Sequence, residues 1–276
     1  MSWLDRSTES VVVDGAQIRY RRFGRPGGTP IVLVHGGAAH AGWWIHVAPV
    51  LAADHDVVVM ELSGHGDSAH RTSYSAQSWS AEIAAVVGRL GAGPVHVVGH
   101  SMGGLVAMLA AAEYPEAVRS LLLIDSSVVS RPVLRPLSRQ VFHYRSHAEG
   151  IARFRLRPRG TIADDETLAR IAAAGLREDA EGWRWKFDPY AMGRIPRDEL
   201  DAATSGIRCR VEFLYGEHSE LVDQTTVDHL SAVLGRDVPC RIAPGAYHHV
   251  PIDAPEATVR SIEQIIHASG AAHHQA

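Results

Sequence analysis

The sequence has few cysteines, little net charge and no long hydrophobic run, and each shortage argues against a class of protein. Only Cys209 and Cys240 occur among 276 residues, too few for a disulfide framework, so we expect both to be reduced core residues. A formal net charge of −4 provides no field that would attract nucleic acid or an acidic membrane. The sequence therefore favours chemistry on a small-molecule substrate.

Signals for membranes and export are also missing. The chain contains no run of about 18 apolar residues that could span a bilayer. Residues 1–10 lack a basic region followed by an apolar run. We therefore expect a soluble, cytoplasmic protein without a membrane partner, either a monomer or a homodimer. The chain length suits one large α/β domain with room for an inserted subdomain.

Short apolar runs alternate with helix-length segments along most of the chain. Residues 11–13, the turn pair Asp14-Gly15 and the alternating stretch 17–23 predict an antiparallel hairpin. Runs rich in Val, Ile and Leu are typical of buried parallel strands, and they lie at 31–34, 57–60, 95–98, 120–124, 210–215 and 238–242. Helical periodicity occurs between them, at 78–90, 103–113, 225–234 and 257–267. This pattern predicts an α/β fold with a mostly parallel, doubly wound sheet and ligands at the carboxyl ends of its strands.

The alternation stops between residues 127 and 205, where helical pieces occur without a strand-like run. We interpret 127–205 as a helical cap, or lid, inserted into a core formed by residues 1–126 and 206–276. Such an insertion leaves the strand order of the sheet intact and covers its functional edge.

Residues 95–111 carry the strongest catalytic signal. The pentad Gly99-His100-Ser101-Met102-Gly103 follows a buried-strand pattern and precedes an apolar helix without proline, which is the context that a G-x-S-x-G nucleophile elbow requires. The elbow holds its serine in a strained turn, so small residues must flank it where backbone segments approach closely. The pattern predicts Ser101 as a nucleophile.

With this elbow the chain resembles the α/β-hydrolase fold superfamily, of the serine esterase and carbon–carbon hydrolase type, over about residues 11–267 outside the cap. The segment His35-Gly36-Gly37 is similar to the family's oxyanion-hole loop. By that resemblance, the backbone N–H groups of Gly37 and Met102 would form the oxyanion hole. Residues 61–69 resemble the family's D-x-x-G-x-G-x-S loop, with Glu61 in place of aspartate, a departure that affects packing more than chemistry.

The resemblance also implies a general base. Residues 243–256 are similar to the family's loop that bears the catalytic histidine, and His248 occupies the family position. The base must accept the Ser101 proton through one ring nitrogen while the other donates to a carboxylate. We interpret His249 as a neighbour that packs or lines the pocket.

The identity of that carboxylate stays open in the sequence. The family's usual acid lies in a G-x-x-D turn after the strand at 210–215, but here Ser219 stands in its slot. Asp125, at the end of the strand at 120–124, and Glu220, one residue past the slot, both keep the chain order Ser, acid, His. We favour Asp125, because the small residues Ser126 and Ser127 follow it and leave a short, rigid carboxylate at the sheet edge.

Tryptophans mark candidate walls of a substrate pocket. Trp43 follows the oxyanion-hole segment, and Trp183 and Trp185 lie in the densest aromatic cluster of the predicted cap. Ordinary packing explains them nearly as well. No H-E-x-x-H or comparable ligand spacing occurs among the 17 histidines, so we expect neither a metal nor another cofactor.

Together these residues predict a serine hydrolase that cleaves a small or medium ester, lactone or related carbonyl compound through an acyl-enzyme, as a carboxylesterase does. Carbon–carbon bond hydrolysis and cofactor-free perhydrolysis fit the same residues, because a fold does not fix function. The alternative from another class is a non-catalytic small-ligand receptor on the same fold, which the missing acid at the usual turn keeps open.

Overall fold

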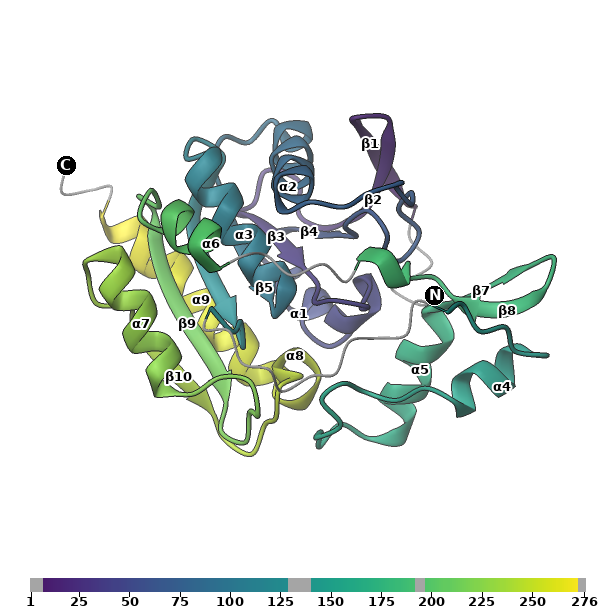
Figure 1. The fold of residues 1–276 in the computed structure, drawn as a ribbon. Coiled ribbons are helices and arrows are strands. Elements are labelled where there is room, and N and C mark those ends of the chain that lie inside the picture. The colour runs from purple at the N-terminus through teal and green to yellow at the C-terminus, as the bar shows by residue number, and fades with distance from the viewer. Residues whose placement is uncertain (1–6, 129–139, 192–196, 273–276) are drawn as a thin grey trace.

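The structure is a computed structural model that describes residues 7–128, 140–191 and 197–272, drawn as a ribbon in Figure 1. Its centre is a sheet of eight strands in the order β1-β2-β4-β3-β5-β6-β9-β10. The six strands from β4 to β10 in this order run parallel, whereas β1 and β2 are antiparallel to their neighbours. The strands span Glu9–Val13 (β1), Ala16–Gly24 (β2), Pro30–Val34 (β3), Asp56–Met60 (β4), Val95–His100 (β5), Val118–Ile124 (β6), Arg210–Gly216 (β9) and Cys240–Ala243 (β10).

Each strand that the sequence predicts is present in this sheet. The predicted hairpin is formed by β1 and β2, and its turn residues Asp14 and Gly15 have φ angles of 46° and 76°. A two-residue hairpin turn of type I′ needs a positive φ at both central positions, which is why an Asp-Gly pair stands there. The α/β fold class with an N-terminal antiparallel hairpin is confirmed.

Alternating side chains of the strands enter two hydrophobic layers. Ile31 and Leu33 of β3 pack with α1 (Ala48–Leu51) and α9 (Pro255–Ala272) on one face of the sheet. Val32 and Val34 pack on the other face, which is covered by α2 (Ala76–Leu90), α3 (Met102–Glu113) and α7 (Gln224–Leu234). Because both faces are covered, functional side chains can emerge only where the parallel strands end.

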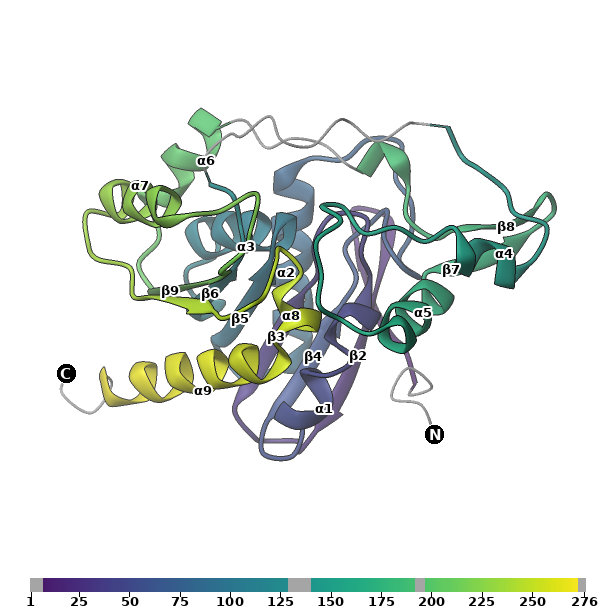
Figure 2. The ribbon, with the colours of Figure 1, turned by 90° about the horizontal axis from the view of Figure 1, so that it is seen from below.

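The segment between β6 and β9, which we call the insertion, contains helices and a second, two-stranded sheet. Its elements are α4 (His147–Ala152), α5 (Asp165–Ala174), β7 (Leu176–Asp179), β8 (Gly182–Trp185), the short 3-10 helix η3 (Pro189–Ala191) and α6 (Arg197–Thr204). Figures 1 and 2 show α4, α5 and the β7–β8 hairpin together at one side of the molecule, whereas α6 packs against α3 and α7 at the opposite side.

The β7–β8 hairpin is a feature that the sequence analysis does not anticipate. Each strand has four residues, and apart from Leu176 their side chains are half-buried or exposed, so no apolar run marks them. The predicted division into a core (1–126 and 206–276) and a cap (127–205) stays a prediction. Residues 129–139 and 192–196 of that range lie outside the described residues.

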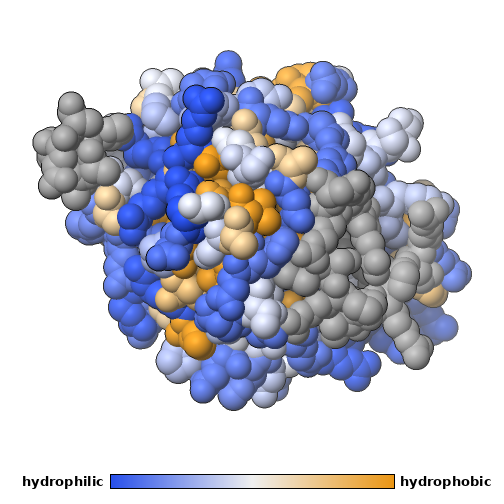
Figure 3. Space-filling view, turned by 60° about the vertical axis from the view of Figure 1, so that its left-hand side comes forward, coloured by the Kyte–Doolittle hydropathy of each residue, from blue (hydrophilic) through white to orange (hydrophobic). Residues whose placement is uncertain are grey.

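The molecular surface on the side of α7 is mostly hydrophilic, with small hydrophobic patches (Figure 3). Large exposed hydrophobic residues occur on separate elements, such as Val12 on β1 and Ile242 on β10, and single residues of this kind are ordinary. In the described part of the chain, no helix has the length and apolar composition to cross a membrane.

Candidate active site

Ser101 stands at the sharp turn between β5 and α3. Its φ of 53° and ψ of −122° lie outside the regions that residues with side chains normally occupy. Its N–H donates to the carbonyl oxygen of Ile124 over 2.8 Å, which helps the two adjoining elements to hold the strained turn. The Ser101 side chain is half-buried, whereas His100 before it is buried.

Glycines make room for this turn. A Cβ on Gly99 would lie 2.5 Å from the Cα of Gly104, and one on Gly103 would lie 2.2 Å from the carbonyl oxygen of His35. Both opposing atoms belong to backbone that cannot move aside cheaply. The contacts explain why the G-x-S-x-G pattern needs glycine at its two ends here.

The loop after β3 passes directly beside Ser101. A Cβ on Gly36 would lie only 3.2 Å from the Cβ of Ser101, and residues 36–39 form a turn closed by a 3.2 Å bond from Ala39 N–H to the Gly36 carbonyl. Gly37 is part of this turn. Met102 is the first residue of α3, so its N–H has no acceptor within the helix. The two predicted oxyanion donors thus belong to segments that border the serine, and both residues are half-buried.

His248 and Asp125 form a buried hydrogen-bonded pair. Nδ1 of His248 donates to Oδ1 of Asp125 over 2.7 Å, and the two side chains are 4% and 0% exposed. Asp125 follows β6, and His248 stands in the loop between β10 and α8 (Val250–Asp253). Because β5, β6, β9 and β10 are consecutive neighbours in the sheet, their carboxyl ends bring these distant residues to one edge.

The surroundings of Asp125 and Glu220 differ strongly. Asp125 Oδ2 accepts the Gly216 N–H at 2.9 Å and Oδ1 accepts the Ser219 hydroxyl at 2.7 Å. The serine in the family's acid slot therefore hydrogen-bonds a carboxylate on the neighbouring strand. Asp125 has a φ of 46°, and its N–H donates to Leu214 over 2.8 Å. Glu220 is exposed, so Asp125 is the candidate acid that the fold brings to the histidine.

Burial determines the protonation states of this pair. Burial lowers the pKa of His248, which leaves the imidazole neutral near pH 7. Burial raises the pKa of Asp125 to about 6, against the hydrogen bonds from Gly216 and Ser219 that lower it. Above that pH, an ionised carboxylate faces a neutral imidazole, and this is the state in which a histidine can accept a proton.

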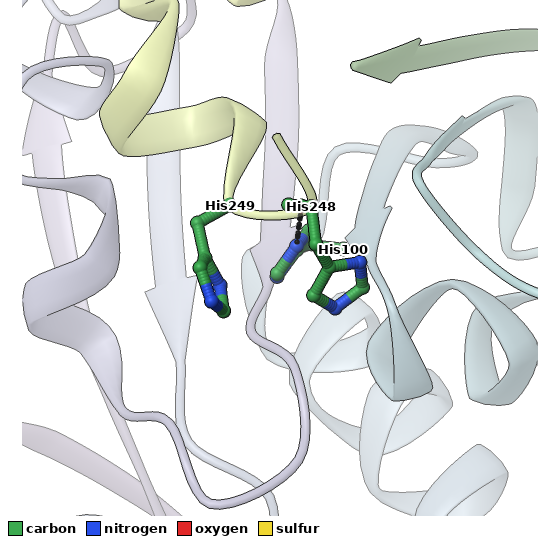
Figure 4. Close-up of side chains that lie close together, drawn as sticks. All are labelled: His100, His248 and His249. Carbon is green, nitrogen blue, oxygen red and sulfur yellow. Dashed lines mark hydrogen bonds between the residues drawn. The ribbon is translucent and has the colours of Figure 1, made fainter. Parts of the chain in front are cut away.

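Two further histidines surround His248 (Figure 4). His100 Nε2 donates to the His248 carbonyl at 2.9 Å, and His249 Nε2 donates to the carbonyl of Pro158 in the insertion at 2.8 Å. His249 thus bonds a backbone carbonyl where His248 bonds a carboxylate. Among the described residues, no hydrogen bond joins the Ser101 hydroxyl to the ring of His100, His248 or His249. Hydrogen bonds between a nucleophile and its base often tighten only when substrate is bound.

A small pocket of about 20 Å³, which is room for roughly one or two water molecules, opens beside the loop after β3. The loop and the insertion line it together, through Ala38, Ala39, His40, Trp43, Gly66, Phe154, Gly175, Trp185, Lys186 and Phe187. The ring of Trp43 lies 5.1 Å from that of His249 and 6.2 Å from that of His100. Trp43 therefore joins the pocket to the histidines next to Ser101.

Two of the three predicted pocket tryptophans line this pocket, and Trp183 does not. Trp183 packs on His147, with ring centroids 4.4 Å apart. It shares a face of β8 with Trp185, but two residues of a strand span roughly 6.6 Å, and Trp183 stands nearer the hairpin turn. Trp183 and Trp185 lie two residues apart on the same face of one strand, so the sequence alone could not show which of them lines the pocket.

Asp253, which the sequence does not mark as a functional residue, ties the histidine loop to the insertion. Its carboxylate accepts the Tyr247 N–H at 2.9 Å, the Ile162 N–H at 3.2 Å and the hydroxyl of Thr161. Asp253 lies within the 243–256 segment that the sequence singles out. A carboxylate next to a helix start ordinarily indicates a cap, so the sequence offers no signal for this role.

The comparisons with known proteins agree with the fold. The sequence profile of the alpha/beta hydrolase fold matches residues 29–214. A 2-(acetamidomethylene)succinate hydrolase of Mesorhizobium japonicum is 30% identical over 76% of this chain and 78% of its own length. The esterase Rv0045c of Mycobacterium tuberculosis is 28% identical over 86% of this chain and 82% of its own length. Two other relatives are matched over only 31% and 36% of their length.

The similarity extends to solved structures. The crystal structure of E-2-(acetamidomethylene)succinate hydrolase has a TM-score of 0.78 with this chain at 24% identity, and the match covers 94% of this chain and 98% of that one. At such an identity the likeness shows the fold alone. Together with the profile, which covers more than half of the residues, and with relatives that are hydrolases, it shows that the chain belongs to the α/β-hydrolase fold family.

Proposed function

We propose that this chain is a serine hydrolase that cleaves a small or medium ester, lactone or related carbonyl compound through an acyl-enzyme. The proposal rests on the 2.7 Å hydrogen bond from His248 to Asp125, next to a serine held in a strained turn. Serine becomes a strong nucleophile when an imidazole can take its proton and a third group orients that imidazole.

In the proposed reaction, Nε2 of His248 removes the proton of Ser101 while the serine oxygen attacks the carbonyl carbon. The N–H groups of Gly37 and Met102 stabilise the oxyanion, and a donor of this kind is typically worth about 3 kcal/mol. His248 then returns the proton to the leaving group. It next deprotonates the water that releases the acid, while Asp125 holds the Nδ1–H tautomer. No cofactor takes part in these steps.

The walls of the pocket beside Trp43 favour an apolar group in the substrate, and the pocket must widen to admit it. Its walls include the aromatic rings of Trp43, Phe154, Trp185 and Phe187, which bind apolar groups by excluding water. Lys186 also lines the pocket, but its ammonium lies 2.7 Å from Asp67 and is neutralised by that carboxylate. A substrate with an uncharged apolar acyl or alkoxy group suits such walls, and this favours carboxylesterase activity.

A second candidate substrate comes from the relatives. One relative is named as a hydrolase of 2-(acetamidomethylene)succinate, whose two carboxylates call for cationic partners in the protein. The pairing of Lys186 with Asp67 argues against that substrate here. Esters with apolar chains therefore come first in the test.

We further propose that the enzyme acts on its small-molecule substrate in the cytoplasm, as a monomer or a homodimer. Cys209 and Cys240 are both free. Free thiols suit a reducing compartment.

The test measures p-nitrophenol release from a series of p-nitrophenyl esters, together with covalent labelling by a fluorophosphonate. We expect turnover and labelling of the wild-type protein, loss of both in Ser101→Ala, and retention of both in Ser205→Ala, which changes an exposed serine at the end of α6. A folded wild-type protein that neither turns over esters nor reacts with the probe would favour the non-catalytic receptor instead.

A further inference from the structure

Next to the candidate nucleophile lies a cluster of three buried histidines, of which the proposed reaction uses only one. One ring nitrogen of each of His100, His248 and His249 lies within 4.8 Å of the other two, and the residues are 2%, 4% and 2% exposed. Figure 4 shows that His100 comes from the end of β5, whereas the other two come from the turn before α8. Because 148 residues separate His100 from His248, no local ligand spacing marks this cluster in the sequence.

Each of the three rings uses one nitrogen to donate a hydrogen bond. His248 donates to the Asp125 carboxylate, His100 to the His248 carbonyl and His249 to the Pro158 carbonyl. Because these oxygens can only accept, the bonded nitrogen carries the hydrogen in each ring. The other nitrogen of the neutral ring therefore presents a lone pair. In proteins, outer hydrogen bonds of this kind fix the tautomer of metal-binding histidines.

Two of these lone pairs have no partner within the described structure. Nδ1 of His100 and Nδ1 of His249 are buried and make no hydrogen bond, although a buried polar atom without a partner costs about 1 to 3 kcal/mol. Burial also lowers the pKa of all three rings, so that they are neutral near pH 7. Only a neutral imidazole has a lone pair to give to a metal.

The backbone of the loop after β3 runs close against the ring of His100. A Cβ on residue 36 would lie 2.9 Å from Nδ1 of His100, closer than a side-chain carbon can approach without displacing the ring. Because residue 36 is glycine, no side chain from this loop covers that nitrogen. Ser101, next to the cluster, is half-buried.

We propose that His100, His248 and His249 bind one zinc ion. Three imidazoles and one open position form a common tetrahedral zinc site with Zn–N bonds of about 2.0 to 2.1 Å, which places the ligand atoms roughly 3.3 Å apart. The rings must therefore move together by up to about 1.5 Å from their present separation, which side-chain rotation provides. The ligands are Nδ1 of His100, Nδ1 of His249 and Nε2 of His248.

The ion would occupy the lone pair with which His248 accepts the Ser101 proton. Zinc binding and ester hydrolysis would then exclude each other, and zinc would act as a reversible inhibitor. This consequence rests on the proposed function. The binding itself does not, because it requires only the three rings.

The experiment titrates the full chain with zinc chloride in a calorimeter and with cobalt chloride in a spectrophotometer, where tetrahedral Co²⁺ has intense visible absorption. We expect one zinc ion per chain at this site and at least about a tenfold loss of affinity in His249→Gln. The glutamine amide can still donate to the Pro158 carbonyl, so the fold is retained. His100→Gln is the second variant and should show a similar loss.

A matched control addresses zinc binding at the surface. His143 lies 3.3 Å from both Asp179 and Glu181, so it stands for histidines that could bind zinc at the surface. His143→Gln should leave the affinity unchanged. The proposal is overturned if His249→Gln binds zinc as tightly as the wild-type protein, or if affinity is lost in His143→Gln instead.

Ester hydrolysis then separates this proposal from the proposed function. We expect zinc to inhibit the wild-type protein, a chelator to restore activity, and inhibition to require about tenfold more zinc in His249→Gln. If the protein binds zinc but hydrolyses no ester, the proposed function fails and the metal site stands. If it hydrolyses esters with no site-specific zinc binding, the metal site fails and the proposed function stands.

Discussion

The edge of the central sheet and the insertion contribute the two walls of the candidate site, and different interactions hold them in place. Ser101, Asp125 and His248 stand at the ends of strands β5, β6 and β10, which are fixed by backbone hydrogen bonds and by two large hydrophobic layers. Two residues of the insertion, Ala191 and Leu200, enter one of those layers. Among the described residues, α4, α5 and the β7–β8 hairpin instead meet the core at a small hydrophobic cluster, Ala39, Trp43, Leu156, Ile171 and Ile252.

Single polar contacts also link the insertion to the core. His40 bonds the Ile171 carbonyl at 3.0 Å, His46 bonds Thr167 at 3.0 Å, and the Tyr74 hydroxyl donates to Asp188 at 2.7 Å. Polar contacts of this kind contribute about 1 kcal/mol each, far less than a hydrophobic layer. We therefore expect substitutions at the sheet edge to change kcat or stability, and substitutions in the insertion to change substrate binding.

The largest expected effect tests the sheet edge. Asp125→Asn keeps the size of the side chain but presents an amide that no longer holds the Nδ1–H tautomer of His248. The kcat for ester hydrolysis should fall about 10⁴-fold, with KM nearly unchanged.

Glu220→Gln is the matched control for Asp125→Asn. Glu220 is exposed, so the kcat of the Glu220→Gln variant should stay within about twofold of the wild-type value. The opposite result, a large loss in Glu220→Gln and none in Asp125→Asn, would show that another carboxylate orients His248.

The next effect concerns stability. Gly103→Ala would place a Cβ 2.2 Å from the His35 carbonyl oxygen and 2.8 Å from that of Val34. Overpacking against backbone should lower the free energy of unfolding by roughly 1 to 3 kcal/mol, measured by urea denaturation, and should lower kcat because the displaced strand end leads into the oxyanion-hole loop.

Gly88→Ala tests a glycine that has free space around it, in a helix on the same side of the sheet. Gly88 lies within α2, and a Cβ there would meet nothing within 4 Å. Alanine should raise the free energy of unfolding by about 0.5 to 1 kcal/mol, because glycine weakens a helix interior. Equal destabilisation by the two substitutions would contradict the close contact at Gly103.

Within the insertion, two tryptophans of one strand should behave differently. Trp185 lines the pocket and donates to the Tyr144 hydroxyl at 3.0 Å, whereas Trp183 packs on His147. Trp185→Ala should raise KM for esters with apolar chains about tenfold, which corresponds to ~1.4 kcal/mol, and should leave kcat nearly unchanged. Trp183→Ala should leave KM unchanged, and a similar rise in both variants would point to general loosening of the hairpin.

The sheet was predictable from the sequence because its signals are local. Six apolar runs, the Asp14-Gly15 turn and the pentad around Ser101 each depend on residues that are neighbours in the chain. The β7–β8 hairpin was missed because its strands are short and bury little, so its position depends on contacts with the core and not on a periodic pattern.

Other features of the site depend on pairs that the chain separates widely. Asp125 and Glu220 both lie between Ser101 and His248 in the chain, so chain order could not decide between them. The structural features that favour Asp125 are its positive φ and the hydrogen bond that it accepts from the Gly216 N–H on the neighbouring strand. The proximity of His100 to His249 arises in a similar way, because the loop after β10 reaches back along the sheet edge to the end of β5. Such contacts have no signature in a single sequence, because the order of the strands in the sheet must be known first.

The smallest expected effect concerns the hydroxyl that Ser219 donates to Asp125. The proposed mechanism needs an ionised Asp125 and a neutral His248, so kcat/KM of the wild-type protein should fall as the pH decreases through about 6, the pKa of Asp125. The Ser219 hydrogen bond lowers that pKa, so its removal in Ser219→Ala should raise the pKa and shift the midpoint of the profile upward. Ser219→Thr retains a hydroxyl and should keep the wild-type midpoint. A downward shift in Ser219→Ala would mean that the serine does not stabilise the ionised carboxylate of Asp125.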